Sequence, residues 1–233
     1  MTLTPLPPEA DETAPTSGAS VPEAFSPVVK TAGARIKILP LFGQIEGHTA
    51  VPEAVKSTKY EEVLPLLAAV EESEEIDGLL LLLNTVGGDV EAGLAIAEMI
   101  GGMHKPTVSL ILGGGHSIGL PLAVSANTSF VVKSATLTLH PVRFNGLVLG
   151  VEQSFDYFRE MQARIADFVC AHSHISKPDY YALILASGNL ANDTGTLVSG
   201  KEAVEKGLID RLGGIHDALE ELRRKVDRQK SNG

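Results

Sequence analysis

The sequence is poor in cysteine and in basic residues, and both shortages restrict what the protein can be. Cys170 is the single cysteine, so no disulfide forms within the chain. Lysine and arginine number 19 against 29 aspartates and glutamates, and the formal net charge is −10. A surface that binds nucleic acid or an anionic membrane needs a basic cluster, and the sequence contains none. We therefore expect no nucleic-acid partner.

Long apolar runs and targeting signals are also missing. No apolar run reaches the roughly 18 residues that a membrane-spanning helix requires. The first residues, MTLTPLPPEADE, contain neither the basic nor the apolar segment of a secretory signal. The phosphate-binding pattern G-x-x-x-x-G-K-[ST] is absent as well, so the chain has no ATPase site of that kind. These absences predict a cytoplasmic protein without a membrane span.

What is present is the composition of a globular domain with an additional N-terminal segment. The 233 residues are 44% hydrophobic and 21% charged, enough for one substantial core. Residues 1–34 hold six of the 13 prolines and little that could enter a core. We interpret them as a disordered Pro-rich arm, residues 35–227 as a single domain and residues 228–233 as a frayed tail.

Apolar runs of strand length alternate with helical patterns in the first half of this domain. The stretches IKILPLFG, GLLLLLN and TVSLIL are typical of buried strands, and SFVVK and TLTLH of two shorter ones. Helical periodicity is found in two segments between these strands, Tyr60 to Val70 and DVEAGLAIAEMI. Strands buried on both faces that alternate with helices predict an α/β fold with a mainly parallel sheet and crossover helices.

The second half of the domain has a different pattern. RFNGLVLG (143–150) is consistent with one extra strand, and the apolar spacing in residues 152–173 predicts a long amphipathic helix. That helix buries its apolar stripe either against its own sheet or against another subunit. SGNLANDTGTLVSG then reads as a loop, and a charged C-terminal helix begins at about His216.

The stretch GGGHSIG (113–119) follows a predicted strand directly and places Ser117 among glycines. A serine hydroxyl becomes a nucleophile when a base takes its proton and backbone N–H groups stabilise the oxyanion that forms. Glycines allow the sharp strand-to-helix turn and the close approach of a substrate carbonyl. The structural alternative is that Ser117 only caps the next helix, a position that serine favours.

A second glycine turn, NTVGGDV (84–90), occurs at the carboxyl end of another predicted strand. Ligands of open parallel sheets bind at such ends, so the Gly88 N–H is a candidate oxyanion donor. The structural alternative is a tight turn in which Asp89 caps the next helix, and both interpretations can hold together.

The third stretch, TLTLHPVR (136–143), supplies a candidate base for Ser117. His140 ends a predicted strand and Pro141 breaks it, which places the imidazole at a sheet edge rather than inside a core. His116 adjoins the serine, but neighbouring side chains usually point apart, so it is the weaker candidate.

These motifs, together with KEAVEKGLID further on, resemble in order and approximate spacing the ClpP family of serine peptidases. The resemblance covers roughly residues 35 to 215. It implies a ClpP/crotonase-like parallel-sheet core with crossover helices and a protruding strand-plus-helix handle at about 143–174. It also implies an enzyme that needs no metal and no organic cofactor.

Carried over by residue, the resemblance implies Ser117 as nucleophile, His140 as general base, and oxyanion N–H groups from Gly88 and Ile118. The third member is open, because an ungapped count from the KEAVEKGLID element reaches a glycine. A two-residue insertion would make Asp193 the orienting carboxylate, and the alternative for that residue is an Asx-turn in a loop.

For partners, the resemblance implies a ring-like homo-oligomer, a polypeptide substrate and an ATPase unfoldase. The longer, Pro-rich N-terminal segment departs from the family pattern and leaves the docking of an ATPase open. The leading hypothesis for function is a serine-type endopeptidase that cleaves short or unfolded polypeptides.

Three other functions are weighed against that hypothesis. A crotonase-like acyl-CoA enzyme would use the glycine N–H groups but would not need the pairing of Ser117 with His140. A Ser/Lys dyad would retain activity without His140. The GGHSIG and HPVR versions of the motifs are similar to those of a ClpP-like subgroup named for enhancing translocation, so a non-proteolytic factor assisting protein translocation or secretion is the main alternative.

Overall fold

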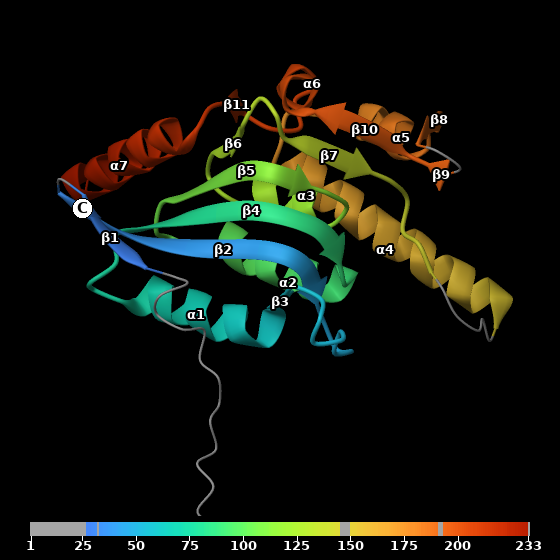
Figure 1. The fold of residues 1–233 in the computed structure, drawn as a ribbon, viewed down its shortest axis with the longest axis horizontal. Coiled ribbons are helices and arrows are strands. Elements are labelled where there is room, and N and C mark those ends of the chain that lie inside the picture. The colour runs from blue at the N-terminus through green and yellow to red at the C-terminus, as the bar shows by residue number, and fades with distance from the viewer. Residues whose placement is uncertain (1–26, 32, 145–149, 191–192, 233) are drawn as a thin grey trace, which may run out of the picture.

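A parallel sheet organises the protein (Figure 1). The computed structural model describes residues 27–31, 33–144, 150–190 and 193–232. The strands are β1 (Val28–Thr31), β2 (Ala34–Glu46), β3 (Ser57–Lys59), β4 (Gly78–Gly88), β5 (Thr107–Gly115), β6 (Ser129–Val131), β7 (Thr136–Leu139), β8 (Ser187–Leu190), β9 (Asp193–Thr194), β10 (Thr196–Ser199) and β11 (Arg211–Leu212). The helices are α1 (Tyr60–Glu72), α2 (Val90–Gly101), α3 (Gly119–Val124), α4 (Val151–Ala171), α5 (Lys177–Ile184), α6 (Gly200–Glu205) and α7 (Ile215–Asn232).

The main sheet has the strand order β1-β2-β4-β5-β6-β11. Strands β2, β4, β5, β6 and β11 pair in parallel, and β3 pairs in parallel with β2. Strand β1 is antiparallel to β2, and β7 connects the sheet to β10, with which it is antiparallel. The predicted α/β fold with a mainly parallel sheet and crossover helices is confirmed.

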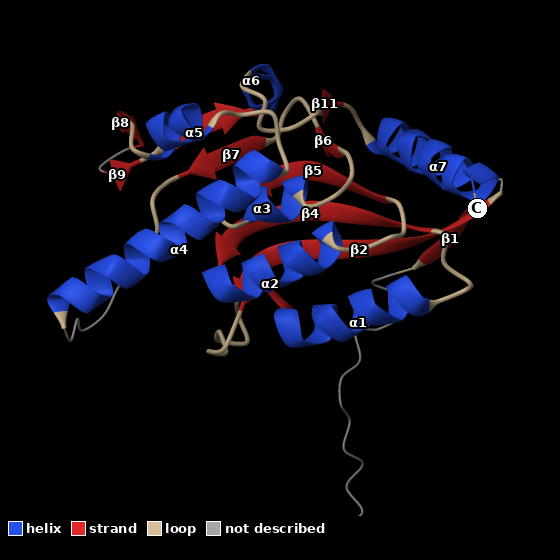
Figure 2. Ribbon diagram, turned by 180° about the vertical axis from the view of Figure 1, so that it is seen from behind, coloured by secondary structure: helices blue, strands red, loops and turns tan. Residues whose placement is uncertain are grey.

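The central strands β4 and β5 carry apolar side chains to both faces of the sheet, which is why their sequences are continuous apolar runs. Leu79, Leu81 and Leu83 enter a core that they share with α1 to α6. Leu80 enters a second core, on the other face, which it shares with α7. Figure 2 shows α1, α2, α3 and α4 in front of the sheet, so these helices cover one face and α7 covers the other.

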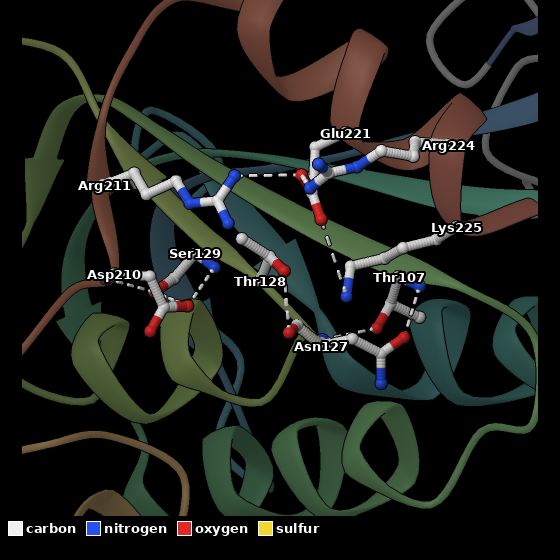
Figure 3. A network of polar contacts seen from close by, with 9 residues as sticks. All are labelled: Thr107, Asn127, Thr128, Ser129, Asp210, Arg211, Glu221, Arg224 and Lys225. Carbon is white, nitrogen blue, oxygen red and sulfur yellow. Dashed lines mark hydrogen bonds and ion pairs between the residues drawn. The ribbon is translucent and has the colours of Figure 1, made fainter.

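Helix α7 is fixed to its face of the sheet by a buried carboxylate (Figure 3). The Glu221 side chain is 7% exposed and accepts a hydrogen bond from Arg211 Nη1 at 2.9 Å. Arg224 donates to the same oxygen, and Lys225 Nζ lies 3.8 Å from the other one. A buried carboxylate is tolerated when cations and hydrogen bonds replace its hydration, and three cations do so here.

Helix α4 divides into two halves of different character. Its C-terminal half contributes the buried residues Met161, Ile165, Ala166, Phe168 and Val169. Its N-terminal half projects beyond the sheet (Figure 1) and carries the exposed side chains of Val151, Phe155 and Tyr157. The first of the two interpretations of this helix, burial against its own domain, therefore holds for one half.

The N-terminal boundary of the domain differs from the expectation. The arm predicted for residues 1–34 extends too far, because Val28–Thr31 pair with residues 34–37 of β2. Short strands of this kind are specified by a partner rather than by their own pattern. Residues 1–26 lie outside the described residues.

The C-terminal boundary differs as well. A frayed tail was the expectation for residues 228–233, but α7 continues to Asn232. Lys230 Nζ lies 3.0 Å from Asp77 Oδ1 and donates to the Gly33 carbonyl at 3.0 Å. These tertiary contacts give the last turns of the helix a reason to form.

Two segments between β7 and α6 also differ from the expectation. The stretch predicted as a loop contains β8, β9 and β10, because β8 pairs with β9 and β10 pairs with β7. The extra strand predicted for 143–150 lies mostly outside the described residues, and Arg143 and Phe144 form no strand. No helix in the described part of the chain is long and apolar enough to cross a bilayer.

Candidate active site

Ser117 lies in the turn between β5 and α3, and its backbone is in the left-handed region with φ of 55°. Within the described residues it is the only residue other than glycine with a positive φ. The alternative that Ser117 caps α3 is wrong, because Ile118 occupies that position. The turn is bonded to both neighbouring strands, since the Ser117 N–H donates to Thr138 O at 2.8 Å and the His116 N–H to Thr85 O at 3.2 Å. Tertiary contacts thus hold the strained conformation, which costs about 1–3 kcal/mol in general.

Glycines around this turn are required by space. A Cβ at Gly87 would lie 2.7 Å from the Ser117 Cβ, and one at Gly93 would lie 2.3 Å from the Ile118 side chain. A Cβ at Gly88 would lie 2.1 Å from the Ile45 carbonyl oxygen. The two glycine motifs therefore pack together. A side chain at one of these glycines would displace Ser117 or the residues next to it.

His140 follows β7 directly, and its side chain bonds to the backbone of the next residue. Its Nδ1 lies 2.7 Å from the Pro141 carbonyl oxygen, to which it donates, so in the neutral ring Nε2 is the acceptor. The next amide, of Val142, donates to Gln162 Oε1 of α4 at 2.8 Å. Helix α4 thereby fixes the segment that carries the imidazole.

The glycine motif at the end of β4, the serine turn and the segment of His140 all line one cavity of about 130 Å³. Four of the five residues predicted for the site, Gly88, Ser117, Ile118 and His140, line it together. Within the described residues, the Ile118 N–H donates no backbone hydrogen bond, which leaves this amide available to an oxyanion. The rest of the lining is mainly apolar and consists of Val90, Leu120, Leu139, Pro141, Val142, Arg143, Ile165 and Tyr180.

The sequence interpretation missed part of this lining. Ile165 comes from α4 and Tyr180 from α5, and both carry the ordinary pattern of core residues, so nothing in the sequence distinguishes them. Tyr180 is buried, which raises the pKa of its hydroxyl. Arg143 belongs to the HPVR stretch that was singled out for its histidine, and that stretch was the available signal for it.

Asp193 is the first residue of β9, and its side chain lies outside what the structure describes. The ladder between the antiparallel strands β10 and β7 ends with Thr196 opposite Leu139, so it ends one residue before His140 and three residues after Asp193. The role of Asp193 stays a prediction.

His116 turns away from the cavity and toward β7. Its Nδ1 lies 3.0 Å from the Thr138 N and 2.9 Å from Thr138 Oγ1. Burial lowers the pKa of this imidazole. The expectation that His116 is the weaker candidate for the base agrees with this orientation.

The fold and this cavity define an α/β protein with a serine and a histidine together at the carboxyl ends of parallel strands. The model of the family described as Clp protease matches residues 42–215, and the chain belongs to this family. The mutant structure of ClpP1 from Listeria monocytogenes superimposes with a TM-score of 0.60 at 20% identity, over 78% of this chain and 94% of that one. At this identity the match shows the shared fold.

Two relatives show where the chain stands in the family. It is 54% identical over 194 residues to the translocation-enhancing protein TepA of Halalkalibacterium halodurans, covering 83% of this chain and 76% of that protein. It is 23% identical over 173 residues to the ATP-dependent Clp protease proteolytic subunit 1 of Protochlamydia amoebophila, covering 73% of this chain and 82% of that protein. The expected likeness to the ClpP family and to its translocation-enhancing subgroup is confirmed.

Proposed function

We propose that the protein is a serine-type endopeptidase that cleaves short or unfolded polypeptides in a self-assembled oligomer. The observation that carries this proposal is the strained Ser117 in a cavity that it shares with His140. Backbone strain at a nonglycine residue persists where the surrounding structure imposes it, and such positions cluster at active sites. A serine that served only packing or capping would not need this conformation.

In the proposed reaction Ser117 Oγ attacks the carbonyl carbon of the scissile peptide bond while His140 Nε2 accepts its proton. The N–H groups of Gly88 and Ile118 stabilise the negative charge on the carbonyl oxygen. His140 returns the proton to the leaving amine, and water then hydrolyses the acyl-enzyme in the same way. In this scheme the Asp193 carboxylate takes the place of the Pro141 carbonyl as the acceptor of the His140 Nδ1–H and so orients the imidazole.

The lining of the cavity favours an apolar side chain next to the bond that is cut. Leu120, Ile165 and Tyr180 supply an apolar wall, and burial of an apolar group there contributes roughly 25 cal/mol per Å². The small volume of about 130 Å³ admits one side chain and its backbone rather than a folded surface. A substrate therefore has to enter as an extended or short chain.

Self-assembly is supported by the exposed apolar side chains on the projecting N-terminal half of α4. Val151 is 74% exposed, Phe155 65% and Tyr157 51%, on the end of the helix that projects from the domain. Aromatic side chains are enriched where protein surfaces meet. We propose that this end of α4 contacts further copies, and light scattering of the wild type and of Phe155→Glu tests it. An unchanged mass for the variant would contradict the contact.

The ATPase partner and the cytoplasmic location expected from the sequence remain predictions. A second function is favoured by the name of the relative from Halalkalibacterium halodurans, which describes a protein that enhances translocation. If that role is independent of proteolysis, Ser117→Ala would support protein export as well as the wild type does. If the role needs the proposed chemistry, the same variant would fail to support it.

The direct test of the peptidase is hydrolysis of short fluorogenic peptides with an apolar residue before the cleaved bond. We expect turnover by the purified wild type and loss of nearly all of it in Ser117→Ala and in His140→Ala. Turnover that survives in His140→Ala would point instead to another base. No turnover by the folded, assembled wild type would count against the proposal.

A further inference from the structure

The residue before the candidate nucleophile is bonded to the strand that carries the candidate base. Thr138 of β7 is the meeting point, because its carbonyl accepts from the Ser117 N–H at 2.8 Å and its N–H donates to His116 Nδ1 at 3.0 Å. We propose that His116 is a positioning residue, which holds the end of β7, and with it His140, at the correct distance from Ser117. This inference rests on the proposed peptidase function.

The backbone contact fixes the chemical form of the imidazole. The Thr138 N–H can only donate, so His116 Nδ1 must accept, and the ring is neutral with its proton on Nε2. The Thr138 hydroxyl, at 2.9 Å from the same nitrogen, can share this acceptor. A protonated ring would present a donor to a donor, so only the neutral ring makes the contact.

On the side that faces β5 the sheet holds β7 weakly, whereas on its other side all four residues of β7 pair with β10. Strands β5 and β7 pair in parallel at one position, Gly114 opposite Thr136, and the ladder ends there. Two residues further along, the His116 side chain and the Ser117 amide replace the missing ladder bonds at Thr138. His140 is two residues beyond Thr138, so the last bonds before the candidate base on this side come from the serine turn.

The neighbouring glycine is shaped to the ring. A Cβ at Gly114 would lie 2.7 Å from both Cδ2 and Nε2 of His116, so the position admits no larger residue while the ring is there. Strand, glycine and ring thus form one packed unit. This accounts for a glycine that the turn alone does not require, since Gly114 has no positive φ.

The expected consequence concerns reaction rate rather than substrate binding. A displacement of about 1 Å at a reacting group can cost on the order of 100-fold in rate. The cavity wall formed by Leu120, Ile165 and Tyr180 does not include His116, so substrate binding should change little. Loss of the Nδ1 acceptor should therefore lower kcat and leave KM nearly unchanged.

Three substitutions separate a positioning role from simple packing. His116→Phe keeps the ring and removes the acceptor. His116→Asn places an oxygen where Nδ1 is now, whereas His116→Gln places its oxygen nearer to Nε2. His172→Phe is the control, because His172 Nδ1 also bonds to the backbone, donating to the Phe168 carbonyl at 2.9 Å, and because, like His116, it does not line the cavity.

The measurement is the rate of fluorophosphonate labelling at Ser117, with kcat and KM for a short peptide and a thermal melt for each variant. We expect His116→Phe and His116→Gln to label roughly 10- to 100-fold more slowly, with KM within about twofold of the wild type. We expect His116→Asn to recover most of the rate and His172→Phe to match the wild type.

The outcomes are distinguishable. If the wild type labels and His116→Phe labels equally fast while folded, the inference is overturned and the peptidase stands. If Asn and Gln behave alike, the acceptor position is irrelevant and the inference is overturned as well. If the wild type itself does not label, the proposed function fails and takes this inference with it.

Discussion

Gly87 faces Ser117 so closely that a methyl group on Gly87 would lie 2.7 Å from the Ser117 Cβ and 2.9 Å from the His116 carbonyl oxygen. The two glycine motifs, which lie about 30 residues apart in the sequence, are therefore two sides of one packed contact. The end of β4 has no side chain at Gly87 because the turn after β5 occupies that space. The position of the serine depends on both.

The first prediction follows from this contact. Gly87→Ala should lower the free energy of unfolding by about 2 kcal/mol or more beyond the cost of a strained φ alone, because the new methyl group must displace backbone. Gly33→Ala is the matched control, since Gly33 has φ of 86°, close to the 90° of Gly87, with nothing within 4 Å of its Cβ position. Chemical denaturation of both variants measures the difference. Equal losses would mean that the contact with Ser117 carries no energy.

A second prediction concerns the strain at Ser117 itself. Ser117→Gly should be more stable than Ser117→Ala by about 1 kcal/mol, because glycine adopts a φ of 55° without the steric cost that alanine retains. Both variants lack the hydroxyl, so the comparison isolates the backbone. Thermal melts of the two proteins under one condition decide it. If alanine were as stable as glycine, the turn would not be strained.

Much of the fold could be predicted because its signal is local. The runs GLLLLLN and TVSLIL are long enough and apolar enough to indicate β4 and β5 without any partner. Strand β10 was missed because TLVS is short and becomes a strand through its antiparallel pairing with β7. The last turns of α7 were missed for a similar reason, since Lys230 is held by Asp77, which is distant in the sequence.

The candidate site shows the same division. Gly88, Ser117, Ile118 and His140 stand in recognisable motifs and the structure brings them to one cavity. The contact of His116 with Thr138 could not be predicted, because it depends on where the ladder between β5 and β7 ends. Sequence patterns indicate which residues follow a strand, whereas the bonds between such ends depend on the packed structure.

A third prediction is a pH dependence of stability due to His116. Burial lowers the pKa of this imidazole below its ordinary value of 6.5, so the unfolded chain binds a proton at a higher pH than the folded protein does. The contribution of the neutral His116 to the free energy of unfolding is fully present above about pH 6.5 and is lost as the pH falls through the lowered pKa. The free energy of unfolding, measured by chemical denaturation at several pH values in this range, should fall with decreasing pH for the wild type. It should fall less for His116→Asn.

Carboxylates provide the control for that measurement because they act at lower pH. Burial opposes the effect, yet hydrogen bonds from the backbone and the ring of His104 hold the pKa of Glu71 below 4.5. The stability that the Glu71 carboxylate contributes is present above pH 4.5 and is lost as the pH falls through its lowered pKa. A slope that is identical in the wild type and in His116→Asn between pH 6.5 and 5 would contradict the role assigned to burial of His116.

The fourth prediction tests the docking of α7. Glu221→Ala removes a buried carboxylate that three cations surround and should cost about 1–3 kcal/mol of stability, less than a fully buried pair because the cations are partly solvated. Glu220→Ala is the control on the same helix, since the Glu220 side chain is 70% exposed, and should change stability by less than about 0.5 kcal/mol. Equal effects of the two substitutions would contradict the role of the buried group.

The same variants also test the separation of the two faces. Helix α7 packs in the second core, whereas the cavity of Ser117 and His140 lies on the other face of the sheet, which α1 to α4 cover. Glu221→Ala should therefore leave the labelling rate of Ser117 unchanged below its lowered melting temperature. A lower rate in the folded variant would show that α7 is coupled to the site.

The central claim is that Ser117 is an activated nucleophile whose base is His140. The measurement that tests it most directly is fluorophosphonate labelling of the assembled protein, read by intact mass and peptide mapping, with Ser117→Ala and His140→Ala as controls. We predict stoichiometric modification of Ser117 in the wild type and none in either variant. Absence of labelling in the folded wild type, or undiminished labelling in His140→Ala, would contradict the claim.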